Sequence, residues 1–463
     1  MIFEILGVNF EGKKEIFSYD NSNNVLTKKS SGEVYGFTEK QPPPQSPSVP
    51  FSKTSPLKKS KEISILKIQL GLSCNYSCDY CSQRFVERAP ETNKHDIDEF
   101  MSKLENLSFS EGRGLKIEFW GGEPLVYWKT LVPLVEALNK RFKSWKVKPV
   151  FSMITNGSLL NGEINTWLIN NCFRISISHD GPAQHVRGPD PLEVPETKDA
   201  ILALFKALHP IGRISFNSML HRKNISRTAL RKFFIELTGD ETVTLGEGGL
   251  IDSYDEGGQE NSLTTKKEHF EFRKTSFNEF HETGGDVGFP AITERVNGFI
   301  NSILSQRPAD VLGQKCGMDE PTTIALDLRG NVITCQNVSA VQVAPNGELH
   351  LGGNIEKFDE ITLKSGTHWK NREHCSSCPV LHLCRGSCLF LEGENWDLSC
   401  ENAYSNNIPL FALALTKLTG YVPVYIAGGD LPAQRKDIWG DMLEHKETRC
   451  KKIFPIKVEV LNV

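Results

Sequence analysis

Ten of the twelve cysteines in this chain fall into two groups, three at 74–81 and seven at 316–400, and the first group most constrains the fold. Cys74, Cys78 and Cys81 have the spacing Cys-x3-Cys-x2-Cys directly after a predicted strand. Three thiolates on one short loop suit a cubic [4Fe–4S] cluster, in which they bind three irons and leave the fourth open. A cluster that only transfers electrons has cysteine on all four irons, whereas an open iron allows a small molecule to bind. The loop therefore predicts a catalytic cluster, with zinc binding as the alternative.

The bulk composition is that of an ordinary globular protein. The chain has 463 residues, 39% of them hydrophobic and 24% charged, with a net charge of −4. This length suits two or three domains, and the balanced charge gives no reason to expect nucleic-acid or membrane-surface binding. The sequence shows no signal peptide and no apolar run of about 18 residues. We expect a cytoplasmic protein whose cysteines bind metal rather than form disulfides.

Strand and helix patterns alternate from residue 63 to 251, which predicts an α/β fold. Alternation of this kind produces parallel βαβ units, and six units fit a partial (β/α)6 TIM-type barrel. Barrels of this type gather their chemistry at the carboxyl ends of the strands, where the cysteine loop lies. The predicted strands are 63–70, 115–120, 150–155, 173–178, 213–219 and 242–245, and the helices between them are 94–106, 126–144, 158–170, 195–208 and 225–237.

The segments outside the barrel have different patterns. Residues 1–40 form a small β-rich segment, with strands expected at 2–10, 15–19, 24–28 and 33–37, and 41–62 form a proline-rich linker. Residues 252–315 form a helical connector with helices at 264–282 and 291–306. The cysteine-rich region 316–400 has few apolar runs, so its fold is expected to depend on metal. A helical tail follows at 401–463, with helices at 402–419 and 433–445.

Two motifs near the predicted strand ends suggest a bound ligand. Tyr80 precedes the third cysteine of the loop, where an aromatic ring can cover a nucleobase; the alternative is an ordinary buried tyrosine. Gly121, Gly122 and Glu123 offer free backbone carbonyls and one carboxylate as acceptors for an ammonium group. An isolated Gly-Gly-Glu-Pro is more often a turn, but here it follows the cysteine loop by one βα unit.

The cysteine loop, the Gly-Gly-Glu-Pro motif, the Thr-Asn-Gly strand end and residues 178–182 together resemble the radical S-adenosylmethionine (SAM) superfamily. The resemblance implies that SAM binds the open iron and is reductively cleaved to methionine and a 5′-deoxyadenosyl radical, which abstracts hydrogen from a substrate. It also implies that Gly121, Gly122 and Glu123 hold the methionyl ammonium group. Contacts to the ribose or carboxylate are expected from Asn156, Ser178, Arg187 and Asn217, although Ser178 and Asn217 also suit ordinary strand positions.

The second cysteine group resembles the seven-cysteine SPASM extension found on many radical SAM enzymes. That resemblance implies two auxiliary [4Fe–4S] clusters, three clusters in all, and places a SPASM domain at 316–400. A zinc ribbon that uses four of these cysteines is the alternative. The resemblance implies that Cys375, Cys378, Cys384 and Cys400 surround one auxiliary cluster and that Cys316, Cys335 and Cys388 surround the other.

The chain departs from anaerobic sulfatase-maturing enzymes, which share this architecture, in two respects. The second set has no assured fourth ligand. The fourth position could be filled by Cys450, by a carboxylate such as Asp319 or by a substrate thiolate, or its iron could stay open. Gln336 follows Cys335, where those enzymes have an aspartate that acts as the base, and an amide cannot accept a proton near neutral pH. Three acidic residues are suggested as replacement bases by their position alone: Glu247, Asp252 and Asp255. The favoured alternative is that they are solvated charges on a loop.

These features together predict a SPASM-type radical SAM enzyme that modifies a peptide or protein, with a thioether or carbon–carbon crosslink in a ribosomally made peptide as the leading reaction. The expected partners are that peptide and a flavodoxin- or ferredoxin-type electron donor. Oxidation of cysteine or serine to formylglycine is disfavoured by Gln336, and a small-metabolite substrate is not excluded. A non-catalytic iron–sulfur electron carrier is the alternative outside enzymes.

Overall fold

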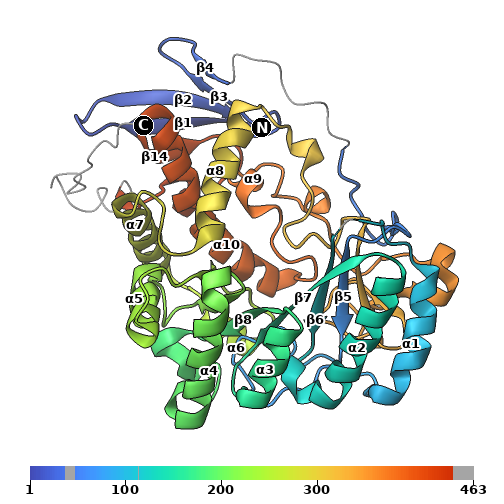
Figure 1. Cartoon of the computed structure of the whole chain (residues 1–463). Helices are drawn as coiled ribbons and strands as arrows, with labels where there is room; N and C mark the ends of the chain where they lie inside the picture. The colour runs from blue at the N-terminus through green and yellow to red at the C-terminus, as the bar shows by residue number, and fades with distance from the viewer. Residues whose placement is uncertain (37–46, 113, 442–463) are drawn as a thin grey trace.

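The fold is built on two sheets, which the computed structural model describes together with their helices over residues 1–36, 47–112 and 114–441. The larger sheet has nine strands in the order β10-β9-β8-β7-β6-β5-β11-β12-β13, and it occupies the lower part of the molecule in Figure 1. The smaller sheet has five antiparallel strands in the order β14-β1-β2-β3-β4 and lies at the top. The fold is therefore a mixed α/β fold.

Six parallel strands form the first part of the large sheet and confirm the predicted alternation. Each strand pairs in parallel with its neighbour, for example Leu66 with Ile117 and Ile177 with Phe216. Helices α1 to α5 connect these strands and lie along one side of the sheet (Figure 1). The bounds are β5 Ile65–Gln69, α1 Ile97–Lys103, β6 Gly114–Trp120, α2 Trp128–Ser144, β7 Lys148–Thr155, α3 Gly162–Asn170, β8 Arg174–Ser178, α4 Pro195–Leu208, β9 Ile214–Leu220, α5 Arg227–Thr238 and β10 Leu245–Leu250.

The apolar spacing of the helices explains why they pack there. In α2, Leu131, Leu134, Val135 and Leu138 recur at intervals of three and four residues, and each of these side chains is fully buried. That spacing places them along one face of the helix, which packs against the sheet.

Three further strands join the large sheet from the cysteine-rich region. Strand β11 (Thr323–Asp327) pairs in parallel with β5, and β12 (Asn331–Ile333) and β13 (Leu351–Asn354) continue antiparallel. Among the described residues, the sheet ends at β10 and β13. Because β11 lies beside β5, the second cysteine group is brought next to the cysteine loop that follows β5.

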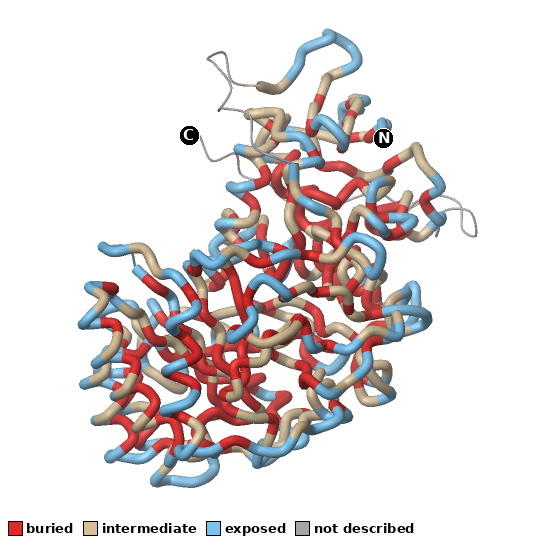
Figure 2. Tube along the Cα trace, turned by 90° about the vertical axis from the view of Figure 1, so that its right-hand side faces the viewer, coloured by how far each residue is buried: buried red, intermediate tan, exposed pale blue. Residues whose placement is uncertain are grey.

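The small sheet contains a strand that the sequence patterns did not indicate. Its first four strands are β1 Ile2–Val8, β2 Lys14–Asp20, β3 Val25–Lys28 and β4 Val34–Tyr35, close to the expected positions. The fifth, β14 (Val422–Ala427), comes from the predicted helical tail and pairs antiparallel with β1. Figure 2 shows buried residues in both the small upper part and the large lower part, and one continuous hydrophobic cluster includes residues of both sheets. The N-terminal strands are therefore part of the main body.

The described end of the proline-rich segment packs against the cysteine-rich region. Phe51 is fully buried and Leu57 pairs with Leu363 in an isolated bridge. Lys59 Nζ donates to the carbonyls of Met318 and Glu320 at 2.6 and 3.0 Å. Residues 47–62 therefore do not form a free linker, because their side chains are used in packing.

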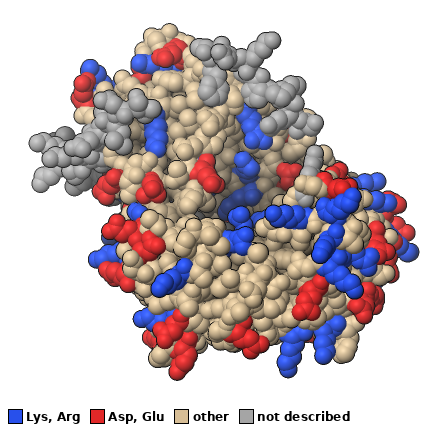
Figure 3. Space-filling model, in the orientation of Figure 1, with Lys and Arg blue, Asp and Glu red and all other residues tan. Residues whose placement is uncertain are grey.

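The remaining helices connect the two sheets. The predicted connector contains α6 (Glu256–Asn261), α7 (Lys266–Glu282) and α8 (Pro290–Leu304), and α7 and α8 both pack on the long helix α10 (Gly393–Thr419). Two short helices complete the described chain, α9 (Leu381–Cys384) and α11 (Ala433–Lys436). Figure 3 shows a hollow between the upper and lower parts in which Lys and Arg side chains gather. Within the described residues, no helix is long and apolar enough to cross a membrane.

Candidate functional site

The cysteine loop after β5 forms one wall of a cavity of about 230 Å³. Cys74, Cys78 and Cys81 all line this cavity. The backbone N–H groups of Tyr76 and Gln83 donate to the sulfurs of Cys74 and Cys81 at 3.3 and 3.4 Å. Such bonds stabilise sulfur in its thiolate form. Burial raises the pKa of Cys78 to about 12.

Gly121 and Gly122 allow the loop to pack directly on the end of β6. A Cβ atom on Gly121 would lie 2.8 Å from the Gly71 carbonyl oxygen, and one on Gly122 would lie 2.4 Å from the Ser73 carbonyl oxygen. Glu123 N donates to that same Ser73 oxygen at 3.0 Å. Both glycines line the cavity, and both are needed because the two backbones approach each other closely.

Glu123 has a buried carboxylate that is fixed by hydrogen bonds from neighbouring residues. It is 2% exposed, and its oxygens accept from Leu125 N at 3.0 Å, Thr155 Oγ1 at 2.7 Å and Asn156 N at 2.7 Å. Burial raises the pKa of Glu123, while these hydrogen bonds oppose the shift. The carboxylate therefore joins β6 to the end of β7, and Oε2, with one bond, retains room for one further donor.

The opposite wall of the cavity comes from the ends of β7 and β8. Asn156, Ser178 and Arg187 line it, as predicted for ligand contacts. Asn156 Nδ2 donates to Asn75 Oδ1 at 2.9 Å and so links this wall to the cysteine loop. Six of the eight residues predicted to contact SAM therefore surround one space with the three cysteines.

The other two predicted contacts, Tyr80 and Asn217, are not among the described residues that line the cavity. The Tyr80 hydroxyl donates to the fully buried carboxylate of Asp180 and accepts from Arg187 Nη1 at 2.8 Å. This places Tyr80 in a polar network behind the cavity. Asn217 lies on β9, and its Oδ1 is buried with no hydrogen-bond partner in the part of the chain that the structure describes. Contact of either residue with SAM stays a prediction.

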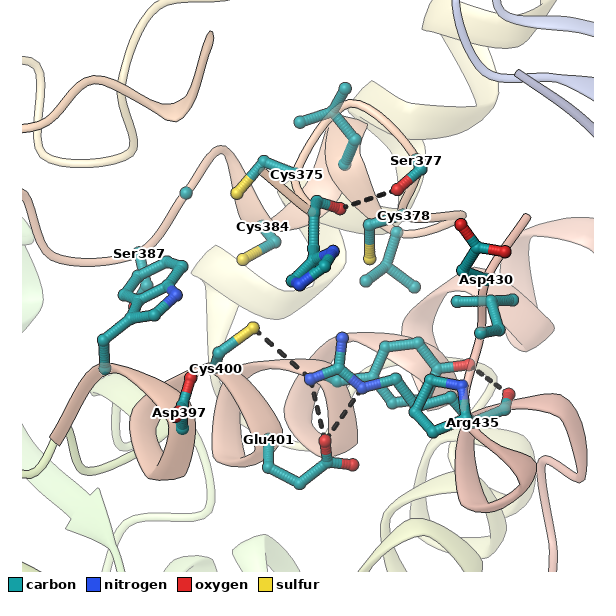
Figure 4. Close-up of a pocket in the computed structure, with 18 residues that line it drawn as sticks. Cys375, Ser377, Cys378, Cys384, Ser387, Asp397, Cys400, Glu401, Asp430 and Arg435 are labelled. Carbon is teal, nitrogen blue, oxygen red and sulfur yellow. Dashed lines mark hydrogen bonds and ion pairs between the residues drawn. The ribbon is translucent and has the colours of Figure 1, made fainter. Parts of the chain in front are cut away.

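Four of the C-terminal cysteines lie around a second cavity, and their division into two ligand sets stays a prediction. Cys375, Cys378, Cys384 and Cys400 line one cavity of about 380 Å³ (Figure 4). At about 30 Å³ per water molecule, this cavity would hold roughly a dozen waters, far more than a site for one metal ion needs. Burial raises the pKa of Cys378 to about 12, and the nearby cysteines Cys384 and Cys400 act in the same direction.

The second set, Cys316, Cys335 and Cys388, lies close enough for each thiol to influence another. Burial raises the pKa of Cys335 to about 12, and Cys316 and Cys388 add to the effect. Asp319, a candidate fourth ligand, is engaged through one oxygen, because its Oδ2 accepts from Gln314 N at 2.8 Å and lies 3.5 Å from His368 Nε2. Its Oδ1 is buried and has no hydrogen-bond partner among the described residues. Cys450, the other named candidate, lies outside the described residues.

A further cavity, of about 210 Å³, adjoins the cavity of the cysteine loop. The two share Cys81, Ser82 and Asn337 as lining residues. Cys335 and Cys388 line the far side of the further cavity, so it lies between the cysteine loop and the second set. Its walls are mixed. The apolar residues include Phe85, Val86, Val338, Phe390 and Leu391, and the polar residues include Tyr254, Asp255, Gln342, His350, Glu392 and Asn395.

The predicted bases have different surroundings. Asp255 lines the further cavity but also caps α6, accepting from Gly258 N at 2.9 Å. Asp252 accepts from Ser387 Oγ at 3.0 Å, next to Cys388. Glu247 lies on β10, where its backbone pairs with Ser218. Proton transfer by any of the three stays a prediction.

Among the described residues, the cysteine sets do not form a preformed site for a single ion. In the described ranges, no three His, Cys, Asp or Glu side chains are placed to hold one metal ion. A zinc ion about 2.3 Å from each sulfur draws tetrahedral thiolates to about 3.8 Å from one another. Sulfurs spread around a cavity suit a multi-iron cluster better.

Comparison with known families agrees with this geometry. Residues 68–228, from the end of β5 to the start of α5, match the Radical SAM superfamily. The chain carries a radical SAM domain. This domain implies SAM and one four-iron cluster as cofactors.

Two curated relatives extend the comparison. The chain is 26% identical over 180 residues to the radical SAM cyclopropyl synthase TigE of Paramaledivibacter caminithermalis, which covers 35% of this chain. The match spans 36% of TigE, so the chain corresponds to about a third of that relative's length. This chain is also 21% identical over 362 residues to a cysteine-type anaerobic sulfatase-maturating enzyme of Clostridium perfringens. That match covers 74% of this chain and 93% of the relative.

Solved structures show the same fold. A structure of anSMEcpe with bound AdoMet matches with a TM-score of 0.53 and 21% identity, over 76% of this chain and 99% of that one. A structure of anSMEcpe with AdoMet and the Kp18Cys peptide matches with a TM-score of 0.54, 20% identity and the same coverage.

Three residues near these cavities were not predicted as site residues, although Asp180 belongs to the 178–182 motif. Asn337 lies between the two adjoining cavities, and Asp180 holds Tyr80 and Arg187. Arg435, from the short helix α11, lines the cavity of the four cysteines. Asn337 follows Cys335 by two residues and Asp180 follows β8, so position alone could have suggested them, but Arg435 lies far from any motif.

The close approach at Gly122 yields a test. Gly122→Ala is expected to push the Ser73 carbonyl away, to destabilise the protein by about 1–3 kcal/mol and to lower the iron bound at the cysteine loop. Gly162→Ala is the matched control, because nothing lies within 4 Å of a Cβ atom there. Iron per chain after anaerobic reconstitution and the midpoint of chemical unfolding measure both effects. Equal iron content in the two variants would contradict the role assigned to Gly122.

Proposed function

We propose that this protein is a SPASM-type radical SAM enzyme that modifies a peptide or protein substrate, with a partial (β/α)6 barrel and three [4Fe–4S] clusters. The observation that carries the proposal is the adjoining pair of cavities, which runs from the cysteine loop through Asn337 to Cys335 and Cys388. A substrate in the further cavity would lie next to SAM on one side and next to the second cysteine set on the other.

The roles of the chain's own residues follow from their positions. Cys74, Cys78 and Cys81 would hold the first cluster, while Gly121 and Gly122 keep the loop in register with β6. With SAM bound there, the site would supply a 5′-deoxyadenosyl radical for hydrogen abstraction. Phe390, Leu391 and other apolar side chains of the further cavity would limit the water that competes for that radical.

The C-terminal cysteines are proposed to hold two auxiliary clusters. Cys375, Cys378, Cys384 and Cys400 provide four thiols around one cavity, whereas Cys316, Cys335 and Cys388 provide three. The auxiliary clusters would accept the electron that remains after a crosslink forms. One iron of the three-cysteine site would then be available to a substrate thiolate.

A thioether or carbon–carbon crosslink in a ribosomal peptide is the reaction we favour. Forming such a bond removes two hydrogens from the peptide, one to 5′-deoxyadenosine and one as a proton. Formylglycine formation is the second candidate, because the sulfatase-maturating relative is matched over 93% of its length. Gln336 argues against it, because its amide cannot act as a base and its Oε1 accepts instead from Lys67 Nζ at 3.4 Å. A flavodoxin or ferredoxin in the cytoplasm would supply the reducing electron.

Anaerobic reconstitution tests the proposal. The reconstituted protein is expected to hold about twelve irons per chain, four for each cubane cluster, and to release 5′-deoxyadenosine from SAM when dithionite is added. Full iron content without 5′-deoxyadenosine would leave only an electron carrier. About four irons per chain would contradict the auxiliary clusters.

The substrate class needs a separate measurement. Short peptides encoded by open reading frames adjacent to this gene are incubated with the reconstituted enzyme and analysed by mass spectrometry. Loss of two hydrogens with no change in other atoms supports a crosslink, whereas exchange of a cysteine sulfur for an aldehyde oxygen indicates formylglycine. Modification of none of these peptides, with 5′-deoxyadenosine still formed, would count against a peptide substrate.

A further inference from the structure

Arg435 reaches into the cavity of the four C-terminal cysteines from a part of the chain that carries no cysteine motif (Figure 4). Its Nη2 donates to Cys400 Sγ at 3.3 Å. The side chain is 11% exposed, and its guanidinium carbon lies 4.9 Å from the centre of the Tyr404 ring. This hydrogen bond from a buried cation to a sulfur is not implied by the arrangement of the four cysteines.

Glu401 holds Arg435 in this position. Arg435 Nε and Nη2 contact Glu401 Oε2 at 2.8 and 2.7 Å, so the guanidinium bridges the carboxylate and the sulfur (Figure 4). On its other side, Glu401 Oε1 lies 3.6 Å from Arg273 Nη2. The planar guanidinium has enough N–H groups for both contacts, whereas a lysine ammonium is a point donor that would have to divide between them.

The small sheet anchors the segment that carries Arg435. Strand β14 pairs with β1, and a Cβ atom on Gly428 just after β14 would lie 2.8 Å from the Ile2 carbonyl oxygen. Asn21, at the end of β2, donates through Nδ2 to the carbonyls of Ser376 and Cys378 at 3.0 and 2.9 Å. The N-terminal strands therefore contact the four-cysteine cavity from one side and hold the Arg435 segment on the other.

We infer that Arg435 is a positioning residue for the auxiliary cluster of Cys375, Cys378, Cys384 and Cys400, and that it raises the reduction potential of that cluster. This inference rests on the proposed function. A cubane with four thiolates carries a net charge of −2 when oxidised and −3 after it gains one electron. A neighbouring cation and a hydrogen bond to sulfur stabilise the more negative form more strongly, so reduction becomes easier. A cluster tuned in this way is suited to accept an electron.

The charges around the cavity support a specific role for Arg435. Arg372 also lies near these cysteines, but its Nη2 donates to the backbone carbonyls of Cys388 and Leu389 at 3.1 and 3.3 Å. Lys315 influences Cys384 only through space. Of the Lys and Arg side chains in the described ranges, Arg435 is the one with a hydrogen bond to a cysteine sulfur.

The test is a redox titration of the reconstituted enzyme, followed by the electron paramagnetic resonance signal of the reduced clusters. Arg435→Gln is expected to shift the one-electron equilibrium of one cluster about tenfold, which is about 59 mV to more negative potential. Glu401→Gln removes a nearby negative charge and is expected to shift the same signal to more positive potential. A variant of Cys74, Cys78 and Cys81 to alanine, titrated in parallel, identifies the signals that do not come from the first cluster.

Opposite shifts in the two variants support the inference, because general loosening of the site would move both in one direction. Lys436→Gln is the matched control, since it removes the same charge from the next residue of α11, and it is expected to leave the potential unchanged. If Arg435→Gln retains about twelve irons per chain and its potential is unchanged, the inference about Arg435 is contradicted, while the proposed function is not. If Arg435→Gln fails to retain iron, Glu401→Gln decides: an unchanged or more negative potential there contradicts the inference. About four irons in the unaltered chain would instead contradict the proposed function.

Discussion

Replacement of Cys78 by serine is expected to abolish formation of 5′-deoxyadenosine from SAM. Cys78 is the middle residue of the loop that lines the cavity, and it would hold one of only three ligated irons of the first cluster. Loss of that thiolate leaves two protein ligands, too few to retain the cluster. Iron is expected to fall from about twelve to about eight per chain, because the C-terminal sites are unaltered. Iron and sulfide analysis and chromatography of the SAM reaction measure these two changes.

Cys172 is the matched control for this substitution. It is an exposed cysteine outside both groups, and Cys172→Ser is expected to keep both the iron content and the product. If Cys78→Ser still formed 5′-deoxyadenosine at the rate of the Cys172 variant, the loop would not be the site of SAM cleavage.

The second large effect concerns stability and centres on Arg227. This side chain is fully buried, and its N–H groups donate to Gly248 O at 2.8 Å, Ser276 Oγ at 3.0 Å and Asn406 Oδ1 at 2.8 Å. It thereby joins α5 to β10, α7 and α10. Arg227→Met is expected to lower the free energy of unfolding by about 3–5 kcal/mol, because buried acceptors lose their donors.

Chemical denaturation followed by circular dichroism measures this loss. Lys232→Met, on the same helix, is the matched control, because the Lys232 side chain is 79% exposed and its removal is expected to change stability by less than about 0.5 kcal/mol. Equal unfolding midpoints for the two variants would show that the network around Arg227 contributes little.

Elements with a strong local pattern were predictable from the sequence. The first five parallel strands and α2, α4, α5, α7 and α8 lie within a few residues of their expected positions, because apolar spacing alone defines which face of each is buried. The sixth strand, β10, lies at Leu245–Leu250 and overlaps the predicted strand 242–245 by one residue. The same reasoning missed β14, since a six-residue strand next to a long helix has little pattern of its own. Its strand conformation depends on pairing with β1, about four hundred residues away in sequence.

The site also has a part that the sequence predicted and a part that depends on long-range contacts. The spacing of the cysteines, with the family resemblance that indicated Asn156, Ser178 and Arg187, was enough to predict residues that line one cavity. Asn156 and Ser178 lie there because parallel strands end at the same edge of a sheet. For Tyr80, the same positional reasoning placed the ring against a ligand, whereas its hydroxyl is held by Asp180 and Arg187. A hydrogen-bond partner one hundred residues away gives no signal in the local sequence.

Local spacing in this chain thus indicated which residues are proposed to bind iron and which strands carry them, because cysteine spacing and apolar periodicity act over a few residues. Tertiary structure alone placed the sets relative to one another. Pairing of β11 with β5 brings Cys335 beside Cys81, and pairing of β14 with β1 brings Arg435 to Cys400. These contacts join segments far apart in the chain, so they depend on the packing of the whole core and not on any short stretch of sequence.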